Sequence, residues 1–136
     1  MPFNIPTLRS IKFLDNKNRS PFYHYQYNID GSWNDLADQT KNVKCGSHGF
    51  HSILFDSVDK YKCMFYHTEI APNAYLVELD GDLDFNTTSM AVIASSEMRF
   101  VEKIDSTVIT DCVLLRKYMI SNQIVRVCDI EHWMCI

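Results

Sequence analysis

Hydrophobic and polar residues alternate in several stretches of the 136-residue chain, a pattern typical of β-strands with one buried face. Residues 9–15 place Ile11 and Phe13 two positions apart, and residues 22–27 are dense in aromatic side chains. The residues between these stretches favour turns, so we predict that the two strands form a hairpin. In such a hairpin three tyrosines share one face of the second strand: Tyr23, Tyr25 and Tyr27.

Further strands are predicted in the second half of the chain. Residues 74–79 alternate, and the Asp-Gly pair at 80–81 is a common two-residue turn between strands. Residues 90–104 predict either one long strand with a bulge or two short strands. A final strand is predicted over residues 123–130, whereas residues 33–44 predict a short helical turn or an extended loop.

Two segments have the apolar spacing of a helix with one buried face. In the first, which begins near residue 54, we expect Asp56 to act as the N-cap. The second covers residues 107–120, and Asp105 or Ser106 is expected to cap it. The predicted buried faces are Leu54, Val58, Tyr61 and Phe65 in the first helix, and Val108, Cys112, Leu115 and Met119 in the second.

The order of these elements predicts the fold class. The strands occur mostly in hairpin pairs, and the two helices are placed separately, which favours an antiparallel sheet over a doubly wound parallel one. A chain of this length buries roughly two-thirds of its unfolded surface and needs no disulfides to stabilise its core. We therefore predict one α+β domain over residues 1–136, with a mainly antiparallel sheet and two helices packed on it.

Composition and charge narrow the classes of function. The formal net charge of −4 argues against general electrostatic binding to nucleic acid or to anionic lipid. The first residues lack the features of a signal peptide, and no apolar run approaches the roughly 20 residues of a membrane helix. We expect a cytosolic protein with no membrane partner. Its odd number of cysteines, five, is then expected to be free thiols.

Cysteine and histidine are concentrated between residues 45 and 67, where thiolate and imidazole are the ligand types that suit zinc. The candidate metal ligands are Cys45, His48, His51, Cys63 and His67, with a second group at Cys128, His132 and Cys135. Because neither group contains a Cys-x-x-Cys pair, we predict no bound metal and no cofactor. As a nucleophile, Cys45 in its glycine-rich loop is a better candidate than Cys63, which we place near the buried face of a helix.

The Gly49-Phe50-His51 motif, preceded by a cysteine, resembles an uncharacterised family of small phage and prophage proteins. The order of elements after it is similar too: a short helix, a strand over 75–79 with Asp-Gly, and a segment like residues 92–100. The family often has a cysteine two residues after the histidine, where this chain has Ile53. The resemblance implies a mobile-element origin and brings no known reaction with it.

Two functions follow from these observations. The first is a small acidic phage-type protein that binds a host or phage protein, in host takeover or evasion of host defences. Its apolar tail, Trp133, Met134 and Ile136, is expected to be covered by a protein partner or by a second copy of the chain. The second is a small enzyme that acts on a nucleotide or an ADP-ribose group. Its candidate catalytic residues are His48, His51, Glu78 and Glu97.

A third prediction concerns the role of His51. Phe50 and Ile53 flank it with apolar side chains, so we expect His51 to be more buried than His24 and to support the fold.

Overall fold

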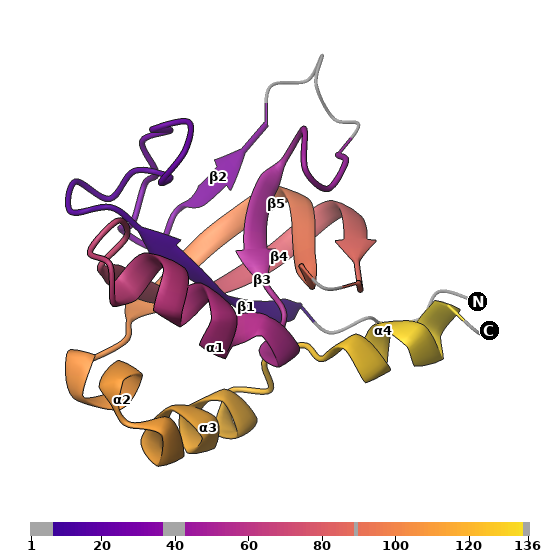
Figure 1. The fold of residues 1–136 in the computed structure, drawn as a ribbon. Helices are drawn as coiled ribbons and strands as arrows, with labels where there is room; N and C mark the ends of the chain where they lie inside the picture. The colour runs from indigo at the N-terminus through magenta and orange to yellow at the C-terminus, as the bar shows by residue number, and fades with distance from the viewer. Residues whose placement is uncertain (1–6, 37–42, 89, 135–136) are drawn as a thin grey trace.

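The computed structural model describes residues 7–36, 43–88 and 90–134, with the backbone alone for residues 132–134. Within this part of the chain, an antiparallel sheet is formed by β1 (Leu8–Leu14), β2 (Trp33–Asp35), β3 (Phe50–Ile53), β4 (Asn73–Asn86) and β5 (Val92–Lys103). The helices are α1 (Val58–Tyr61), α2 (Ser106–Thr110), α3 (Cys112–Ser121) and α4 (Val127–Met134) (Figure 1). This architecture confirms the predicted α+β class, although the helices are shorter and more numerous than the two expected.

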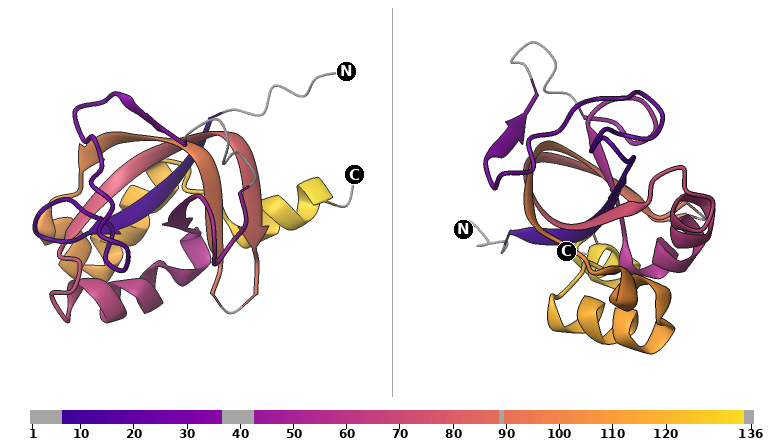
Figure 2. Two further views of the ribbon diagram at one scale, coloured as in Figure 1. Left: turned by 90° about the horizontal axis from the view of Figure 1, so that it is seen from above. Right: turned by 90° about the vertical axis from the view of Figure 1, so that its left-hand side faces the viewer.

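The strand pairings close the sheet into a circuit. β4 pairs with β5 along most of its length and with β1 at its start, and β5 also pairs with β3. β3 and β1 then meet at one register pair, Ile11 opposite Ile53. The circuit β1–β4–β5–β3–β1 surrounds a common interior, which Figure 2 (right) shows end-on, and β2 lies along β5 outside it.

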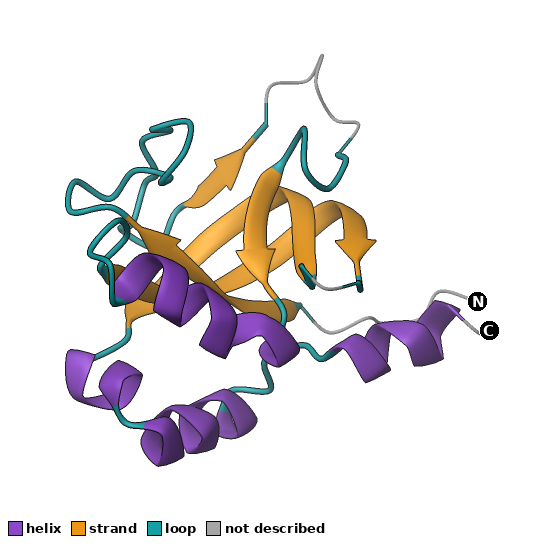
Figure 3. Ribbon diagram, in the orientation of Figure 1, coloured by secondary structure: helices purple, strands orange, loops and turns teal. Residues whose placement is uncertain are grey.

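Apolar residues fill two cores, one on each side of this sheet. The interior core includes Phe50, Val77, Leu79, Ile93 and Phe100. The second core lies between the sheet and the helices, which gather on one side of it in Figure 3, and includes Ile11, Phe13, Leu76, Ile109 and Leu115. Because β1 contributes to both cores, it is buried on both faces.

Side chains hold β1 and β3 together beyond their one register pair, and we call this contact line the seam. The Ser10 hydroxyl donates a buried hydrogen bond of 2.6 Å to the carbonyl oxygen of Ile53. The Lys12 amine donates to the carbonyl oxygen of His51, also at 2.6 Å. Both side chains lie on the face of β1 that turns toward the interior core. The strands separate beyond this point instead of continuing a backbone ladder.

The first predicted helix is confirmed in position and in its buried face. It consists of a 3-10 turn (Phe55–Ser57), α1 and a π-helical segment (Lys62–Tyr66), which together we call the first helical unit. All four residues of the predicted face are buried: Leu54, Val58, Tyr61 and Phe65. Val58, Tyr61 and Phe65 pack in the core between the sheet and the helices, and Leu54 packs in the interior core.

The predicted hairpin with residues 22–27 is wrong. These residues belong to the segment that joins β1 to β2, residues 15–32, which we call the aromatic loop. The Asp15 carboxylate accepts two backbone N–H groups in it, and His24 has a φ of +53°, a left-handed conformation that interrupts an extended strand. Residues 33–35 are β2 instead of a helical turn, and residues 37–42 lie outside the described part of the chain.

The predicted final strand over residues 123–130 is also wrong, because its second half is the start of helix α4. Ile124 forms an isolated parallel bridge with Arg9, and the chain then turns into the helix. The first N–H of α4, from Val127, donates to the Asp56 carboxylate at 2.7 Å. Asp56 therefore does not cap its own helix, as we expected, but binds the start of another one.

The second predicted helix is divided at Asp111. Its backbone is extended there, and its carboxylate accepts the N–H groups of Val113 and Leu114 at the start of α3. Asp105 caps α2 as predicted. The division rotates the apolar face, so that Leu115 and Met119 are buried, Val108 is partly buried and Cys112 is exposed.

The predicted turn at residues 80–81 is a bulge within β4. The register passes from Asp80 opposite Glu97 to Leu83 opposite Ser95, so β4 has one extra residue there. Gly81 allows this with a φ of +78°. Residues 92–103 form one strand, which agrees with the predicted long strand over 90–104.

We predict that Gly81→Ala lowers the free energy of unfolding by on the order of 1–3 kcal/mol more than Gly31→Ala does. Both glycines have positive φ, but a Cβ at Gly31 meets nothing within 4 Å. A Cβ at Gly81 collides with the Ser96 hydroxyl, which accepts the Asp82 N–H at 2.8 Å. Urea denaturation of the two variants measures this difference. Equal losses of stability would show that the bulge tolerates a side chain.

Candidate functional site

The four predicted catalytic residues do not form one site. His48 and His51 lie beside the seam, whereas Glu78 is in an ion-pair cluster with Arg9 and Arg99 on the neighbouring strands. Burial raises the pKa of Glu78, but the hydrogen bonds and charges of the two arginines outweigh it and lower the pKa overall. Glu97 lies on β5, opposite Asp80. Neither glutamate lines the cavity that contains the histidines.

His51 holds in place the loop that precedes β3, residues 45–49, which we call the glycine-rich loop. Its Nε2 accepts the N–H of Gly46 at 2.9 Å, and its Nδ1 lies 3.0 Å from the carbonyl oxygen of Gly49. This pairing assigns the proton to Nδ1, which donates to Gly49. Burial lowers the pKa of His51, so the ring is neutral at pH 7. His51 is half-buried and the His24 side chain is 59% exposed, which confirms the predicted difference.

The predicted metal ligands lie in separate places. Cys45, His48 and His51 belong to the glycine-rich loop and β3, whereas Cys63 and His67 are exposed at the end of the first helical unit. Among the described residues, no three His, Cys, Asp or Glu side chains are grouped in a way that would hold a metal ion. The predicted position of Cys63 near the buried face is wrong, since the π-helical turn directs it to solvent.

Cys45 is not the reactive thiol that its loop position predicted. Its Sγ lies 3.0 Å from the carbonyl oxygen of Asp84, whose carboxylate accepts the Cys45 N–H at 2.7 Å. Burial, with the Asp84 charge, raises the pKa of Cys45 to about 11. The thiol is therefore protonated at neutral pH and a weak nucleophile. The four described cysteines are free thiols.

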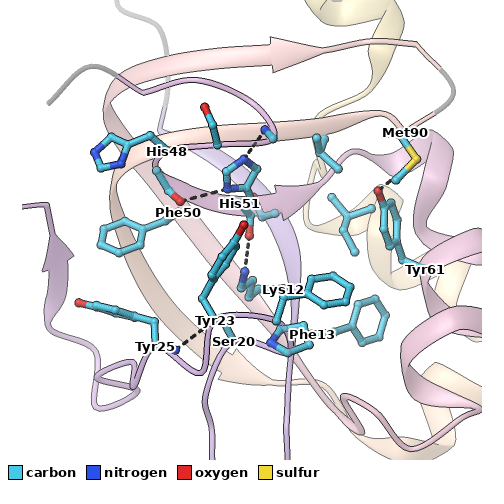
Figure 4. A pocket seen from close by; sticks show the side chains of 18 of the residues that line it. Lys12, Phe13, Ser20, Tyr23, Tyr25, His48, Phe50, His51, Tyr61 and Met90 are labelled. Atoms are coloured by element: carbon cyan, nitrogen blue, oxygen red, sulfur yellow. Dashed lines mark hydrogen bonds between the residues drawn. The ribbon is translucent and has the colours of Figure 1, made fainter. Parts of the chain in front are cut away.

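A cavity of about 510 Å³ opens where β1 and β3 separate, and we call it the seam pocket. Its walls come from β1, the aromatic loop, the glycine-rich loop with β3, and the first helical unit (Figure 4). Apolar and aromatic side chains dominate the lining, among them Phe13, Phe22, Tyr25, Phe50, Tyr61 and Met90. None of the described residues that line it is an aspartate or a glutamate.

Lys12 places its amine in this apolar surrounding. The residue is only 8% exposed, and its Nζ lies 5.4 Å from the centroid of the Tyr27 ring as well as donating to His51. Burial lowers the pKa of Lys12 to about 8. No carboxylate of the described residues forms an ion pair with the amine, which distinguishes Lys12 from ordinary buried lysines.

Ser52 adds a second polar group to the pocket. It is 1% exposed, and its hydroxyl has no hydrogen-bond partner among the described residues. Continuing the antiparallel register by one step from Ile11 and Ile53 sets Ser52 opposite Lys12. A buried hydroxyl without a partner costs stability and points to a ligand or water that supplies the missing bond.

The aromatic loop is anchored so that its side chains form the rim of the pocket. The Asp15 carboxylate accepts the Lys17 and Arg19 N–H groups, each at 2.9 Å, and Ser20 Oγ accepts the Tyr25 N–H at 2.9 Å. The ring of Tyr25 contacts those of Tyr27 and Phe50, while Phe22 packs edge-on against Phe65. Three aromatic residues remain exposed at the rim: Phe22 (68%), Tyr23 (84%) and Tyr25 (45%).

Lys12 and Ser52 were not identified from the sequence as functional residues. In residues 9–15 the alternation marks Ile11 and Phe13 as the apolar face, so Lys12 falls on the face that the pattern leaves polar. The predicted binding residues of the tail lie outside the described side chains: Trp133 and Met134 have only their backbone described, as part of α4, and Ile136 is not described.

No protein-family model, curated protein or solved structure matches this chain. The resemblance to small phage proteins, the protein partner and the cytosolic location therefore stay predictions. Among the described residues, no helix combines the length and the apolar character needed to cross a membrane. What the protein does has to be inferred from its seam pocket.

We expect His51→Ala to lower the free energy of unfolding by on the order of 1–3 kcal/mol at pH 7.5, because the Gly46 N–H loses its acceptor. The folded-state pKa of His51 is lowered, so the unfolded chain binds the proton first as the pH falls. The contribution of His51 is therefore complete above its unfolded pKa, about 6.5, and declines below it. Denaturation at pH 7.5 and pH 5 should show the difference shrinking. An equal effect of exposed His24→Ala would contradict the structural role.

We also predict that the free energy of unfolding rises between pH 8 and pH 9.5 through Lys12. Its folded-state pKa of about 8 lies below the usual 10.5, so the unfolded chain holds one more proton in this range. Stability then increases with pH, by up to about 1.4 kcal/mol per pH unit. Lys12→Met should lack this rise, and the exposed control Lys17→Met should retain it. Identical pH profiles for wild type and Lys12→Met would place the amine in solvent.

Proposed function

We propose that this chain is a binding protein that holds a small apolar ligand in the seam pocket. The observation that carries the proposal is a cavity of about 510 Å³ with aromatic and aliphatic walls and a few buried polar residues, among them Lys12 and Ser52. Ligand sites typically have volumes of roughly 300–1,000 Å³, mostly apolar walls and a few polar groups that orient the ligand. The seam pocket has all three features.

The aromatic loop supports this proposal because its own side chains fix its backbone. Side-chain hydrogen bonds from Asp15 and Ser20 fix its backbone, so little conformational entropy remains to be lost when a ligand binds. Its exposed rings at the rim offer the apolar area that a ligand entering the pocket would cover. The walls and the rim therefore favour a planar, apolar ligand body over a charged one.

The enzyme alternative has less support from the geometry. A general base needs a ring nitrogen that is open to the substrate, but both nitrogens of His51 are bonded to the loop. The thiol of Cys45 is protonated at neutral pH, and the candidate glutamates lie outside the pocket. Of the predicted catalytic residues, the two histidines line the pocket, as parts of its wall.

Binding of the neutral fluorescent probe N-phenyl-1-naphthylamine tests the proposal. We expect saturable binding of one probe per chain, and on the order of tenfold weaker affinity for Tyr23→Ser, since a lost aromatic contact costs roughly 1.4 kcal/mol. Tyr23 is 84% exposed, so the variant should remain folded.

The matched control for this test is Val113→Ser on α3. Val113 is 63% exposed and lies away from the pocket, so the variant removes apolar surface without touching the site. It should bind the probe as the wild type does. Probe binding that is non-saturable, or that both substitutions weaken equally, would show general surface adsorption and refute the proposed site.

A second candidate is the protein partner expected from the sequence, a host or phage protein in the phage-type reading. The exposed rings of Phe22 and Tyr23 favour it, since aromatic residues are enriched at the centres of protein interfaces. A protein partner would contact the aromatic rim, whereas a small ligand would also occupy the inside of the seam pocket. Loss of partner binding in Tyr23→Ser, with no change when Ser52 is replaced by Ala, would favour the protein partner.

A further inference from the structure

Two of the buried polar residues that line the seam pocket differ in kind and occupy opposite register positions on the two strands of the seam. Lys12 contributes an amine from β1, and Ser52 contributes a hydroxyl from the opposite register position on β3. The amine has one acceptor, a backbone carbonyl, and the hydroxyl has no partner among the described residues. In Figure 4 the Lys12 side chain lies between Phe13, Tyr23 and His51, at the centre of the pocket.

The groups that surround the amine favour its neutral form. The titratable groups that face it are Tyr27, Tyr23 and Tyr25 from the aromatic loop, His48 and His51 from the glycine-rich loop and β3, Tyr75 from the facing position of β4, and Tyr61 from α1. Neither tyrosine nor histidine side chains supply the negative charge that would stabilise an ammonium ion. Burial therefore acts on the amine without compensation and leaves its lone pair partly available at neutral pH.

We propose that the Lys12 amine captures an aldehyde group of an apolar ligand as an imine, and that the Ser52 hydroxyl donates a hydrogen bond to the aldehyde oxygen before that oxygen leaves as water. This inference rests on the ligand pocket proposed above. It assigns the ligand a chemical class: an aromatic or aliphatic aldehyde whose body fills the pocket.

The reaction balances without any oxidant or reductant. The neutral amine attacks the carbonyl carbon, a C–N bond forms, and the oxygen gains the carbonyl electron pair and a proton to give a carbinolamine. The nitrogen loses its two protons in all, the carbinolamine oxygen leaves as water, and a C=N bond replaces the C=O bond. Ser52 is a positioning residue that donates to the oxygen as charge develops on it. Water reverses the reaction and releases the aldehyde.

Reductive trapping on the intact chain tests this inference. The protein is incubated with 2-naphthaldehyde and sodium cyanoborohydride at pH 7.5, and peptide mapping by mass spectrometry locates the adduct. We expect Lys12 to be labelled at least tenfold faster than any other lysine, because burial gives it the larger neutral fraction.

Variants separate capture by the pocket from general amine reactivity. Lys12→Met should lose the fast adduct, and Ser52→Ala should slow labelling of Lys12 while keeping the fold, since it removes a hydroxyl without a partner. Lys62→Met is the matched control, because Lys62 is also buried (5%) but does not line the pocket. Its labelling pattern at Lys12 should equal that of the wild type.

The outcomes distinguish this inference from the proposed function. Saturable binding of the neutral probe, with Lys12 labelled no faster than exposed lysines, would overturn imine capture and leave the ligand pocket standing. Fast labelling of Lys12 that is unchanged in Ser52→Ala would refute the role of the hydroxyl. Absence of both probe binding and selective labelling would refute the pocket as a ligand site.

Discussion

Two side chains, instead of a continuous backbone ladder, close the sheet between β1 and β3. Ser10 and Lys12 each donate to a carbonyl oxygen of β3, and the strands share a single register pair. A continued ladder would hold the strands about 4.8 Å apart and fill the space that the seam pocket occupies. The pocket therefore exists because the sheet is closed in this way, and the residue that closes it also provides the amine.

The polar groups of the pocket are costly in free energy for the fold. An amine with a lowered pKa and a hydroxyl with no partner among the described residues each lose hydration that the protein does not fully replace. Apolar residues at these two positions would be a simpler solution for a core. Groups of this kind gather at functional sites, where a ligand supplies the missing interactions. The aromatic loop, held by the Asp15 carboxylate, completes the site from outside.

Much of the fold was predictable because alternation and helical spacing record which residues are buried. β1, β4, β5 and the buried face of the first helical unit appear close to where the sequence placed them. The elements that were predicted wrongly differ from the structure for local physical reasons. Asp15 draws the backbone of residues 15–19 into a loop, and Asp56 and Asp111 cap helices at positions where apolar periodicity predicted something else.

The candidate site was less predictable than the fold. The densest group of reactive side chains lies between Cys45 and His51, and residues 46–51 of it form a wall of the pocket. Its His51 and Cys45, however, are hydrogen-bonded to the surrounding backbone and to Asp84. The chemistry that we propose belongs to Lys12, a lysine in a strand. From the sequence alone, such a lysine is typical of a solvent-facing position. Lys12 is buried because β3 closes the circuit of strands beside it, a contact between residues far apart in the sequence. The local sequence pattern around Lys12 does not indicate this contact.

The pKa of the Lys12 amine is the most direct measure of this account. Heteronuclear NMR of selectively labelled lysine side chains follows each amine through its titration, and Lys12→Met assigns the signal. A midpoint near pH 8 for Lys12, below the usual 10.5 of a lysine amine, is the result that a buried amine in an apolar seam pocket requires. A Lys12 midpoint indistinguishable from those of the exposed lysines would mean that the amine is in water, and the closed seam and its pocket would both be contradicted.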